Sequence, residues 1–411
     1  MMGPIRRLKI LILTPQLPFP PHQGTTLRNF HIIRGLAQRH EIHLLSFLED
    51  GQTAEPALIA PLQEWCTTLH VVDVPRRTRW QRLRRMLARS QPDMAHRLES
   101  DNFGAALQGL LDKHSFDVVQ VEGIELASMI PLVRRASPES QILFDNHNAE
   151  AALQLRAFLT DLRQPSRWPV ALYSLVQAHR LRRYEAWACH AANWLTLVSE
   201  ADHDALRPLL SHKRVSVIPN CIDVAQYQIE QDKAAPCFDV VFSGKMDYRP
   251  NVDAVLWFAR EIWPRILEER PHTTWAIVGQ KPDRRLAPLK NARGVTVTGR
   301  VEGIQPYLAG AKVVVLPLRM GSGTRLKMIE AMAAGKAIVS TRLGAEGFAL
   351  VDNEHLLLAD SPAAFAAAVI RLLQQPAMRA HLASAAAQFA LAYDWRRVTP
   401  RFEEVYAHLI G

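Results

Sequence analysis

The sequence predicts an α/β protein built from two Rossmann-like, doubly wound parallel-sheet domains that face each other across a cleft. Short apolar runs alternate with amphipathic segments of helix length, which is the pattern of βα units in parallel sheets. The pattern restarts near residue 238, after the polar stretch 226–236, which has little periodicity. The length of 411 residues also fits two domains of about 200 residues each.

The predicted strands form two series. The first series comprises residues 8–13, 42–47, 118–121, 142–144, 195–198 and 215–218. The second series comprises residues 239–243, 275–278, 295–298, 313–316 and 337–340. We therefore expect an N-terminal domain over residues 1–226 and a C-terminal domain over residues 227–388. The last segment, 389–411, is predicted to hold an amphipathic helix that bends or starts near Pro400.

Charge and composition narrow the class of partner and the compartment. The net charge of +9 and the pI near 9.6 favour an anionic partner, but no nucleic-acid recognition motif accompanies the charge. The four cysteines show no metal-ligand spacing and are interpreted as reduced thiols of a cytoplasmic protein. The first apolar run is ended by Pro15, too early for a signal peptide, and no run is long enough to span a bilayer.

Residues 321–335 carry the strongest chemical signal in the sequence. They follow an apolar run, and the glycines at 321 and 323 permit a tight turn before a helix-forming sequence begins. The start of such a helix presents unpaired N–H groups and the positive end of its dipole, which favours an anion. Lys327 and Glu330 share one face of this helix. A cation and an acid beside a helix N-terminus favour a ligand with phosphates and hydroxyls, such as a nucleotide sugar.

Two segments of the first domain also follow predicted strands. The proline-rich loop after the first strand ends at Gly24, which permits close approach of a ligand, although an ordinary strand–helix connection is the alternative. The polar turn 145–150 places His147 where it could hydrogen-bond a sugar hydroxyl. The alternative is structural, with Asp145 or Asn148 capping a helix.

Residues 244–251 follow the first strand of the second domain. Gly244 again permits close approach, and Lys245 is placed to neutralise a leaving diphosphate, with a solvated surface charge as the alternative. The Asp-x-Asp pair at 202–204 has a spacing that can bind a divalent metal, but Ser199 makes it resemble a helix capping box. We therefore predict no metal and no cofactor.

A basic segment extends over residues 76–97, with eight arginines and one acid. At helical spacing it has an apolar stripe and an opposite basic face, formed by Trp80, Leu83 and Leu87 and by Arg82, Arg85 and Arg89. Such a helix can bind an anionic membrane surface, and a solvated helix is the alternative. The arginines expected to extend this patch are Arg163, Arg167, Arg180, Arg182 and Arg183.

In combination these motifs resemble those of the retaining GT-B glycosyltransferases, specifically glycosyltransferase family 4, over nearly the whole chain. The resemblance rests on residues 321–335, 244–251, 145–150 and 219–223. It looks closest to the branch of bacterial exopolysaccharide loci, the sugar transferases of exosortase-type systems. The resemblance implies metal-independent transfer, with retention at the anomeric carbon, from a nucleotide-diphosphate sugar to a glycan or lipid-linked acceptor. It also implies that the last helix crosses back onto the N-terminal domain.

The resemblance also assigns roles to individual residues. Glu330 would bind the ribose hydroxyls, and Arg300 and Val301 would border the base. Lys245 would replace the family's usual phosphate-binding arginine, and His147 would contact the transferred sugar or assist at the reaction centre. The other residues predicted to bind the donor are Gly24, Gly244, Gly321, Ser322, Gly323, Thr324 and Arg325.

Two positions depart from the family pattern. The common Glu-x7-Glu motif requires an acid where this chain has Ser322, which leaves recognition of the donor sugar open. The second phosphate-binding lysine would fall at Pro250, which carries no charge. We therefore expect Arg325 and Lys327 to supply the missing positive charge, with Lys327 counted among the catalytic residues.

Two other functions stay open. A nucleotide-sugar epimerase of the same fold would need acids placed for proton transfer or elimination, and the sequence offers no convincing pair. A non-catalytic carbohydrate-binding or scaffold protein is favoured by Ser322, whereas Glu330, Lys327 and His147 together favour an enzyme. A dinucleotide-dependent oxidoreductase is disfavoured because no Gly-x-Gly-x-x-Gly follows either first strand.

Overall fold

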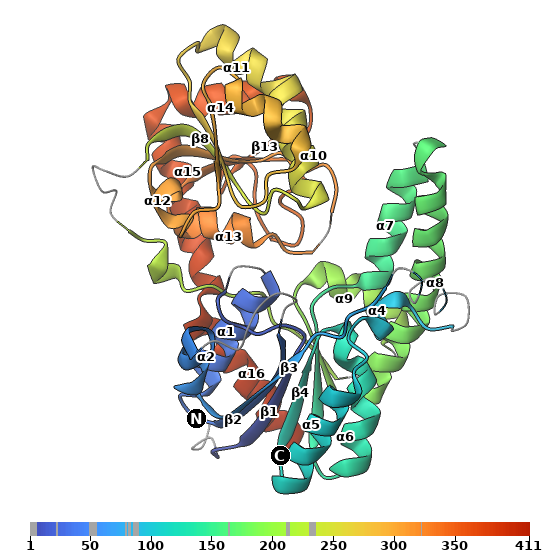
Figure 1. The fold of residues 1–411 in the computed structure, drawn as a ribbon. Coiled ribbons are helices and arrows are strands. Elements are labelled where there is room, and N and C mark those ends of the chain that lie inside the picture. Colours follow the sequence, from blue (N-terminus) through green and yellow to red (C-terminus); the bar gives the residue numbers. More distant parts are fainter. Residues whose placement is uncertain are drawn as a thin grey trace. The chain divides into compact units, whose positions relative to one another are not determined.

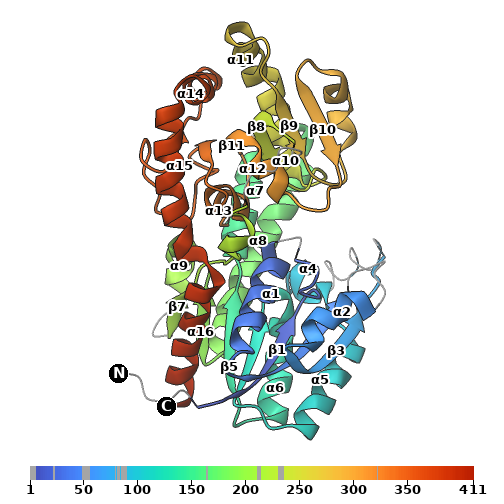
Figure 2. The ribbon, with the colours of Figure 1, turned by 90° about the vertical axis from the view of Figure 1, so that its left-hand side faces the viewer.

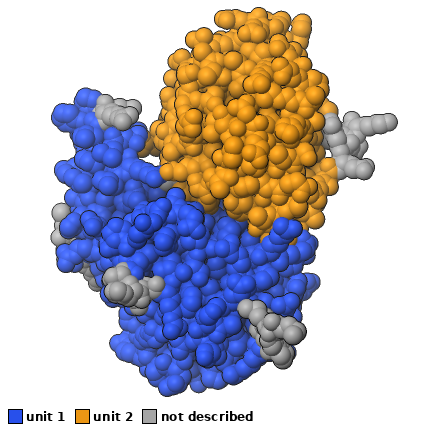
Figure 3. All heavy atoms as spheres, turned by 180° about the vertical axis from the view of Figure 1, so that it is seen from behind, with its two compact units in different colours: residues 1–221, 395–411 blue, residues 222–394 orange. Residues whose placement is uncertain are grey.

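The computed structural model divides into two compact units, which Figure 3 colours separately. Unit 1 comprises Met1–Cys221 and Trp395–Gly411, and unit 2 comprises Ile222–Asp394, so unit 2 is inserted between two parts of unit 1. The structure describes residues 6–21, 24–48, 56–78, 80, 84, 90–162, 165–210, 214–229, 236–321 and 323–411.

Unit 1 contains a parallel sheet of seven strands in the order β3-β2-β1-β4-β5-β6-β7. The strands are β1 (Lys9–Thr14), β2 (Glu41–Leu48), β3 (Cys66–Asp73), β4 (Val118–Glu122), β5 (Gln141–Asn146), β6 (Trp194–Leu197) and β7 (Val215–Val217). The predicted parallel sheet is confirmed, but the edge strand β3 was not predicted. Only one residue of β3 is buried, so its sequence lacks the apolar run that marks the central strands.

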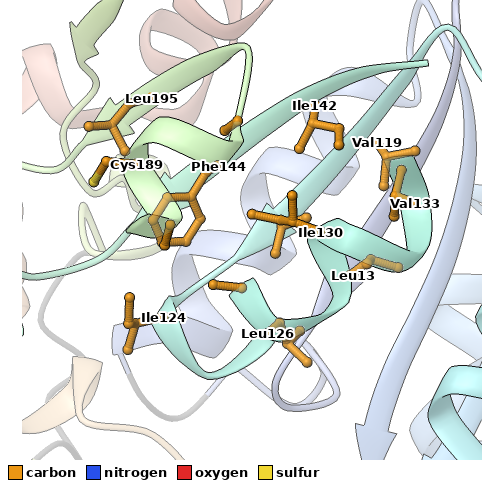
Figure 4. Packing of buried hydrophobic residues seen from close by; sticks show 14 of the residues in the cluster. Leu13, Val119, Ile124, Leu126, Ile130, Val133, Ile142, Phe144, Cys189 and Leu195 are labelled. Atoms are coloured by element: carbon orange, nitrogen blue, oxygen red, sulfur yellow. The ribbon is translucent and has the colours of Figure 1, made fainter. Parts of the chain in front are cut away.

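Helices cover both faces of this sheet, as Figure 1 shows. They are α1 (Gly24–Leu36), α2 (Pro56–Gln63), α4 (Asp93–Arg97), α5 (Asp101–Lys113), α6 (Ile130–Ala136), α7 (Glu150–Leu162), α8 (Trp168–Ala191), α9 (Glu200–Leu206) and α16 (Trp395–Ile410). Shorter 3-10 turns lie at η1 (Ile124–Met129), η2 (Pro165–Arg167) and η3 (Arg207–Leu209). Figure 4 shows one of the two cores, where strand residues such as Leu13 and Phe144 pack with Ile130 of α6. Alternate strand residues pack into the second core on the opposite face.

The last helix, α16, belongs to unit 1 and lies beside α1 (Figure 2). Its buried face, including Phe402 and Tyr406, packs into the same core as Ile33 of α1, as the predicted return to the N-terminal domain requires. The close approach of α1 and α16 depends on Gly35, because a Cβ at that position would lie 2.3 Å from Oγ1 of Thr399. The helix begins at Trp395 and continues through Pro400, so it does not start at that proline; the alternative, a bend near Pro400, stays a prediction.

Unit 2 contains a second parallel sheet, of six strands in the order β10-β9-β8-β11-β12-β13. The strands are β8 (Phe238–Ser243), β9 (Trp275–Val278), β10 (Val295–Gly299), β11 (Ala311–Leu316), β12 (Ala337–Ser340) and β13 (Leu357–Leu358). The predicted pair of Rossmann-like sheets is therefore confirmed. The two-residue strand β13 was not predicted because it is too short to show periodicity.

The helices of unit 2 complete its layers (Figure 1). They are α10 (Arg249–Trp257), α11 (Trp263–Glu269), α12 (Gln305–Ala309), α13 (Leu326–Ala333), α14 (Pro362–Gln374) and α15 (Pro376–Ala390), with a π-helical turn at η5 (Phe258–Ile262) and 3-10 turns at η4 (Val224–Gln226), η6 (Arg284–Asn291) and η7 (Leu391–Tyr393). Within the described parts of both units, no helix combines the length and apolar character needed to span a membrane.

Candidate functional site

In unit 2, two loops meet at one edge of the sheet. The loop after β8 leads into α10, and the glycine loop after β11 leads into α13. Because β8 and β11 are parallel neighbours, their carboxyl ends lie side by side, where α/β sheets bind ligands. The glycine loop touches the start of α10, since a Cβ at Gly321 would lie 3.4 Å from Cγ of Pro250.

Lys327, in the first turn of α13, contacts β8 and α10, the two elements that the loop after β8 connects. Its Nζ donates a 2.6 Å hydrogen bond to Oδ1 of Asn251 and lies 4.6 Å from the ring centroid of Phe242. A Cβ at Gly244 would lie 2.7 Å from this Nζ, so glycine at 244 leaves room for the ammonium group. Burial lowers the pKa of Lys327 to about 7, and the charge of Arg325 adds to that effect. A bound anion would stabilise the charged form.

Glu330 lies one turn after Lys327 on α13. The hydroxyl of Tyr227 donates a 2.9 Å hydrogen bond to Oε1 of Glu330. Burial raises the pKa of Glu330, and this outweighs the opposing effects of Tyr227 and Lys327. Oε1 of Glu330 is thus held by Tyr227, one helical turn after Lys327 on the same helix.

The other predicted residues of the glycine loop lie beside this pair. Arg325 donates from Nη1 to the carbonyl of Gly323 at 2.8 Å. Thr324 lies close to Gly347, where an added Cβ would lie 3.0 Å from the threonine methyl group. The backbone at Gly321 adopts a positive φ of 105°. Ser322 lies outside the described residues.

Lys245, Arg300 and Val301 are further predicted site residues of unit 2, and the structure describes no contact of theirs with Lys327 or Glu330. Lys245 is half-exposed, with its Nζ 3.9 Å from Oδ1 of Asp247, while its carbonyl accepts a hydrogen bond from Asn251 at 2.9 Å. Arg300 is exposed and, with Val301, follows β10. Strand β9 lies between β10 and β8, so these two residues follow a strand about 10 Å from β8 across the sheet.

In unit 1, His147 directly follows β5 and contacts two buried acids. Its Nε2 lies 2.7 Å from Oε2 of Glu122 and 3.8 Å from Oδ2 of Asp145. Burial alone would lower the pKa of His147, but the hydrogen bond and charge of Glu122 raise it overall. Burial raises the pKa of Glu122, and the charge of Asp145 raises it further. The histidine is therefore held by Glu122 in a state that favours the imidazolium.

Arg28, on α1, neutralises Asp145. Its Nε and Nη2 donate to the two carboxylate oxygens at 2.9 and 3.0 Å. This ion pair and the hydrogen bond from Thr196 hold the pKa of Asp145 below its usual value, although burial opposes them. Arg28 also donates to the carbonyls of Ile218 and Pro219 at 3.1 and 2.7 Å. The start of segment 219–223, one of those that carry the family resemblance, is thus tied to the same network.

A second chain of hydrogen bonds reaches Glu122 from the last helix. Tyr406 of α16 donates to the side-chain oxygen of Gln120, and the amide of Gln120 donates to Oε1 of Glu122. All three side chains are buried. The orientation of His147 therefore depends on contacts that extend from β4 to α16.

The turn after His147 is held by acids from elsewhere in the chain. Glu185 of α8 accepts from the N–H groups of Glu150 and Ala151 at 2.6 and 3.0 Å, capping α7. Asp145 is committed to its ion pair with Arg28, so the alternative that it caps this helix is wrong. The capping interpretation of Ser199 is confirmed, because its hydroxyl accepts from the N–H of Asp202.

Among the described residues, Glu122, Asp145 and His147 form a group whose ligand atoms all lie within 4.8 Å of one another. The donor set does not favour a metal. Both oxygens of Asp145 accept from Arg28, and each oxygen of Glu122 already has a hydrogen-bond partner. A cation here would also lie close to the buried guanidinium of Arg28.

Comparison with known proteins identifies the family. A profile described as "Glycosyltransferase Family 4" matches residues 23–226, and one described as "Glycosyl transferases group 1" matches residues 237–375. The chain belongs to the GT-B glycosyltransferases. The resemblance drawn from the motifs is confirmed at this level.

Curated relatives match over part of their length. A "Phosphatidyl-myo-inositol mannosyltransferase" of Mycolicibacterium smegmatis is 29% identical over 208 residues, covering 47% of this chain and 52% of the relative. An "Uncharacterized 44.6 kDa protein in cps region" of Klebsiella pneumoniae is 26% identical over 140 residues, covering 32% and 36%. The matched part thus spans about a third to a half of these relatives.

Solved structures share the fold over their whole length. Sucrose-phosphate synthase from Thermosynechococcus elongatus has a TM-score of 0.71 at 17% identity, covering 98% of this chain and 99% of that one. Anabaena Alr3699/HepE in complex with UDP has a TM-score of 0.65 at 16% identity, covering 98% and 100%.

Several residues of these networks were not predicted as site residues. Arg28, Glu122 and Tyr227 come from elements distant in sequence from the motifs they support. Glu122 did leave a signal, because an acid at the carboxyl end of a buried parallel strand points to the ligand edge of the sheet. Arg28 left no such signal in the sequence, since a single arginine in a helix is normally a surface residue.

Proposed function

We propose that this protein is a glycosyltransferase that takes a sugar from a nucleotide-diphosphate donor and retains its anomeric configuration. The observation that carries the proposal is the placement of Lys327 and Glu330 one turn apart on α13, with Lys327 against Gly244 of the loop after β8 and Asn251 of α10. Family membership supports the reaction class, and Anabaena HepE, whose structure was solved with UDP-glucose, supports the class of donor.

In this proposal the donor diphosphate binds Lys327, Arg325 and the N–H groups at the start of α13. The leaving diphosphate gains negative charge as the glycosidic bond breaks, and preorganised cations stabilise that charge. Lys327 has the stronger structural support, because it reaches Asn251 in the first turn of α10, next to Pro250, where the family pattern would place its second phosphate-binding lysine. Glu330 accepts hydrogen bonds from the ribose hydroxyls through the oxygen that Tyr227 leaves available.

The remaining predicted residues take supporting roles. Lys245 and Gly24 lie near the diphosphate, and Arg300 with Val301 borders the base. His147 donates a hydrogen bond to the transferred sugar, with Glu122 fixing its ring and favouring its protonated form. No metal takes part, because the cations of the protein perform the task that a divalent ion performs in other transferases.

The acceptor is proposed to be a glycan or a lipid-linked molecule in cell-surface or exopolysaccharide synthesis at the cytoplasmic face of the membrane. Two relatives support a lipid acceptor by their names, the mannosyltransferase above and a "Phosphatidylinositol N-acetylglucosaminyltransferase gpi3 subunit" from Schizosaccharomyces pombe. The second relative is 26% identical over 152 residues, covering 35% of this chain and 32% of its own length. The Klebsiella relative, named from a cps region, supports a role in surface polysaccharide.

A thermal-shift screen against UDP, GDP and ADP sugars tests the donor class. A donor present at about 100 times its Kd stabilises the unit that binds it by about 2.7 kcal/mol, so Tm rises by several degrees. Glu330→Gln should abolish the rise, whereas Glu354→Gln, an exposed change in the same unit, should preserve it. The absence of any shift across all donors would count against the proposal.

Product analysis separates the alternatives. Incubation of the best donor with membrane lipids should give a glycolipid whose anomeric configuration, measured by NMR, matches the donor, and excess EDTA should leave the rate unchanged. Conversion of the donor without any acceptor would favour an epimerase. Donor binding without turnover would favour a carbohydrate-binding scaffold.

A further inference from the structure

The α7–α8 hairpin of unit 1 exposes large apolar side chains along both helices. On α7 they recur at helical spacing, at Leu155, Leu159 and Leu162, and on α8 they include Trp168, Leu172 and Leu175. Leu172 is 62% exposed and Trp168 is 57% exposed. Figure 1 shows the two helices extending side by side beyond the sheet. Exposed apolar residues are common singly, but a continuous set on one projection marks an interaction surface.

The large side chains face outward because small or polar ones fill the inner face of α8. Ala171, Ser174, Gln177 and Ala178 are buried, at the spacing that faces a neighbouring helix. The first half of α8, residues 168–179, therefore turns large apolar side chains outward and contains no Asp, Glu, Lys or Arg. A helix of this composition is normally buried in a protein core or in a membrane, not surrounded by water.

The charges of the hairpin have one sign. Residues 151–184 contain six arginines and a single acid, Asp161. Asp161 is buried and pairs with Arg167 at 2.9 Å. Arg182 and Arg183 are exposed two turns after Leu175, between the apolar half of α8 and the body of unit 1. In sequence, Arg156 of α7 and Arg167 of η2 lie among the apolar residues of the hairpin, so arginines flank its apolar side chains on more than one side. Exposed apolar side chains flanked by arginines match a lipid surface, where acyl chains lie beneath anionic headgroups.

The basic segment 76–97 adjoins the same hairpin. The N–H of Asp93 donates a 2.9 Å hydrogen bond to Gln177 of α8, and Arg77 pairs with Asp93 at 3.2 Å. Trp80, in the predicted apolar stripe, is 81% exposed. The other stripe residues and the arginines predicted opposite them lie outside the described residues, so that expected helix stays a prediction.

We propose that the exposed apolar side chains of α7 and of the first half of α8 insert into the headgroup region of an anionic lipid bilayer. Insertion buries the leucines and Trp168 while Arg182 and Arg183 bind lipid phosphates. A second copy of the chain fits this face less well, because pairing two such hairpins would bring arginines together with no exposed acid to oppose them. The inference does not depend on the proposed enzymatic activity.

Flotation of the full-length protein with vesicles tests this proposal. Vesicles of phosphatidylcholine with phosphatidylglycerol should carry the wild type upward, and vesicles of phosphatidylcholine alone should carry much less. The triple variant Leu159→Gln/Leu172→Gln/Leu175→Gln should bind at least about tenfold more weakly, since each change removes an apolar group from the lipid. Arg182→Gln/Arg183→Gln should weaken binding to the anionic vesicles and make it less sensitive to salt.

Controls distinguish binding through this surface from nonspecific hydrophobic binding. Val351, which is 51% exposed in unit 2, gives a matched control, and Val351→Gln should float as the wild type does. Unchanged Tm values for all variants will exclude misfolding. Wild-type flotation unaffected by the triple change would overturn the proposal. Dimerisation of the wild type without vesicle binding, abolished by the triple change, would assign the face to a second copy instead.

Discussion

The two polar networks balance their charges in opposite ways. In unit 1, Arg28 and His147 face Asp145 and Glu122, so two cations oppose two acids within a buried cluster. In unit 2, Lys327 lies near Arg325, and Glu330 is the one acid that opposes its charge in setting its pKa. The first network is complete without a ligand, whereas the second keeps a cation at a cost that an anion would relieve. The proposed function uses this difference: the first network would hold His147 in position towards the sugar, and the second would bind the diphosphate.

Removing Arg28 should break the balance of unit 1 and have the largest effect. Arg28→Met leaves Asp145 buried without its cation, which should destabilise the protein by about 3–5 kcal/mol. Chemical unfolding followed by circular dichroism measures the loss. Arg342→Met, which removes the exposed ion pair with Asp360, should cost less than about 1 kcal/mol. Equal losses in the two variants would show that unit 1 is not held by its buried charges.

Removing Lys327 should have the opposite effect on stability: the protein should become more stable, while donor binding should weaken. Lys327→Met should weaken nucleotide-sugar binding roughly 10- to 100-fold, the size expected for losing a charged hydrogen bond. Because the pKa of Lys327 is about 7 in the folded protein and 10.5 ordinarily, its charge destabilises the fold below pH 10.5 and most strongly below pH 7. The variant should therefore have a higher Tm, most clearly at low pH.

Calorimetry and thermal unfolding of Lys327→Met measure the two quantities, with the exposed Lys290→Met as a control that changes neither. Lost binding together with a lower Tm would mean that Lys327 supports the fold, and the contrast between the units would fail.

The same lysine makes donor affinity dependent on pH. The bound diphosphate favours charged Lys327, so binding should take up protons above pH 7, and affinity should fall by up to about tenfold per pH unit as pH rises. Below pH 7 the lysine is already charged in the free protein, so its titration no longer changes the donor affinity. Titrations with UDP-glucose suit the test, because its diphosphate does not titrate in this range. Proton uptake that persists in Lys327→Met would assign it to another group.

A smaller effect is expected from Glu122. Glu122→Gln keeps a hydrogen-bonding partner but removes the charge that raises the pKa of His147, so the imidazole should titrate at a lower pH than in the wild type. In the wild type the raised pKa stabilises the fold at low pH, and this contribution disappears as pH rises through the folded-state pKa of His147. NMR titration of the ring resolves the change, with Glu125→Gln as a nearby control. An unmoved titration would leave Glu122 with a structural role alone.

Local pattern predicted the fold well, and long-range contacts explain what it missed. Nearly all strands buried on both faces were found because an apolar run survives in the sequence, whereas β3 lacks one. The glycine loop and α13 were found for a similar reason, since turn, helix start and charged face are contiguous. Arg28 meets Asp145 across 117 residues, and nothing local marks either as half of a pair.

The insertion of unit 2 within unit 1 bears on the order in which the chain can fold during synthesis. Unit 2 closes on itself where Ile222 pairs with Asp394, so its residues are complete once position 394 has been made. Unit 1 starts first but lacks α16, whose Phe402 and Tyr406 fill its core. Unit 1, most of which is translated first, therefore completes its core last. Until α16 has been made, the apolar side chains beside α1 that α16 covers stay exposed to solvent and to chaperones.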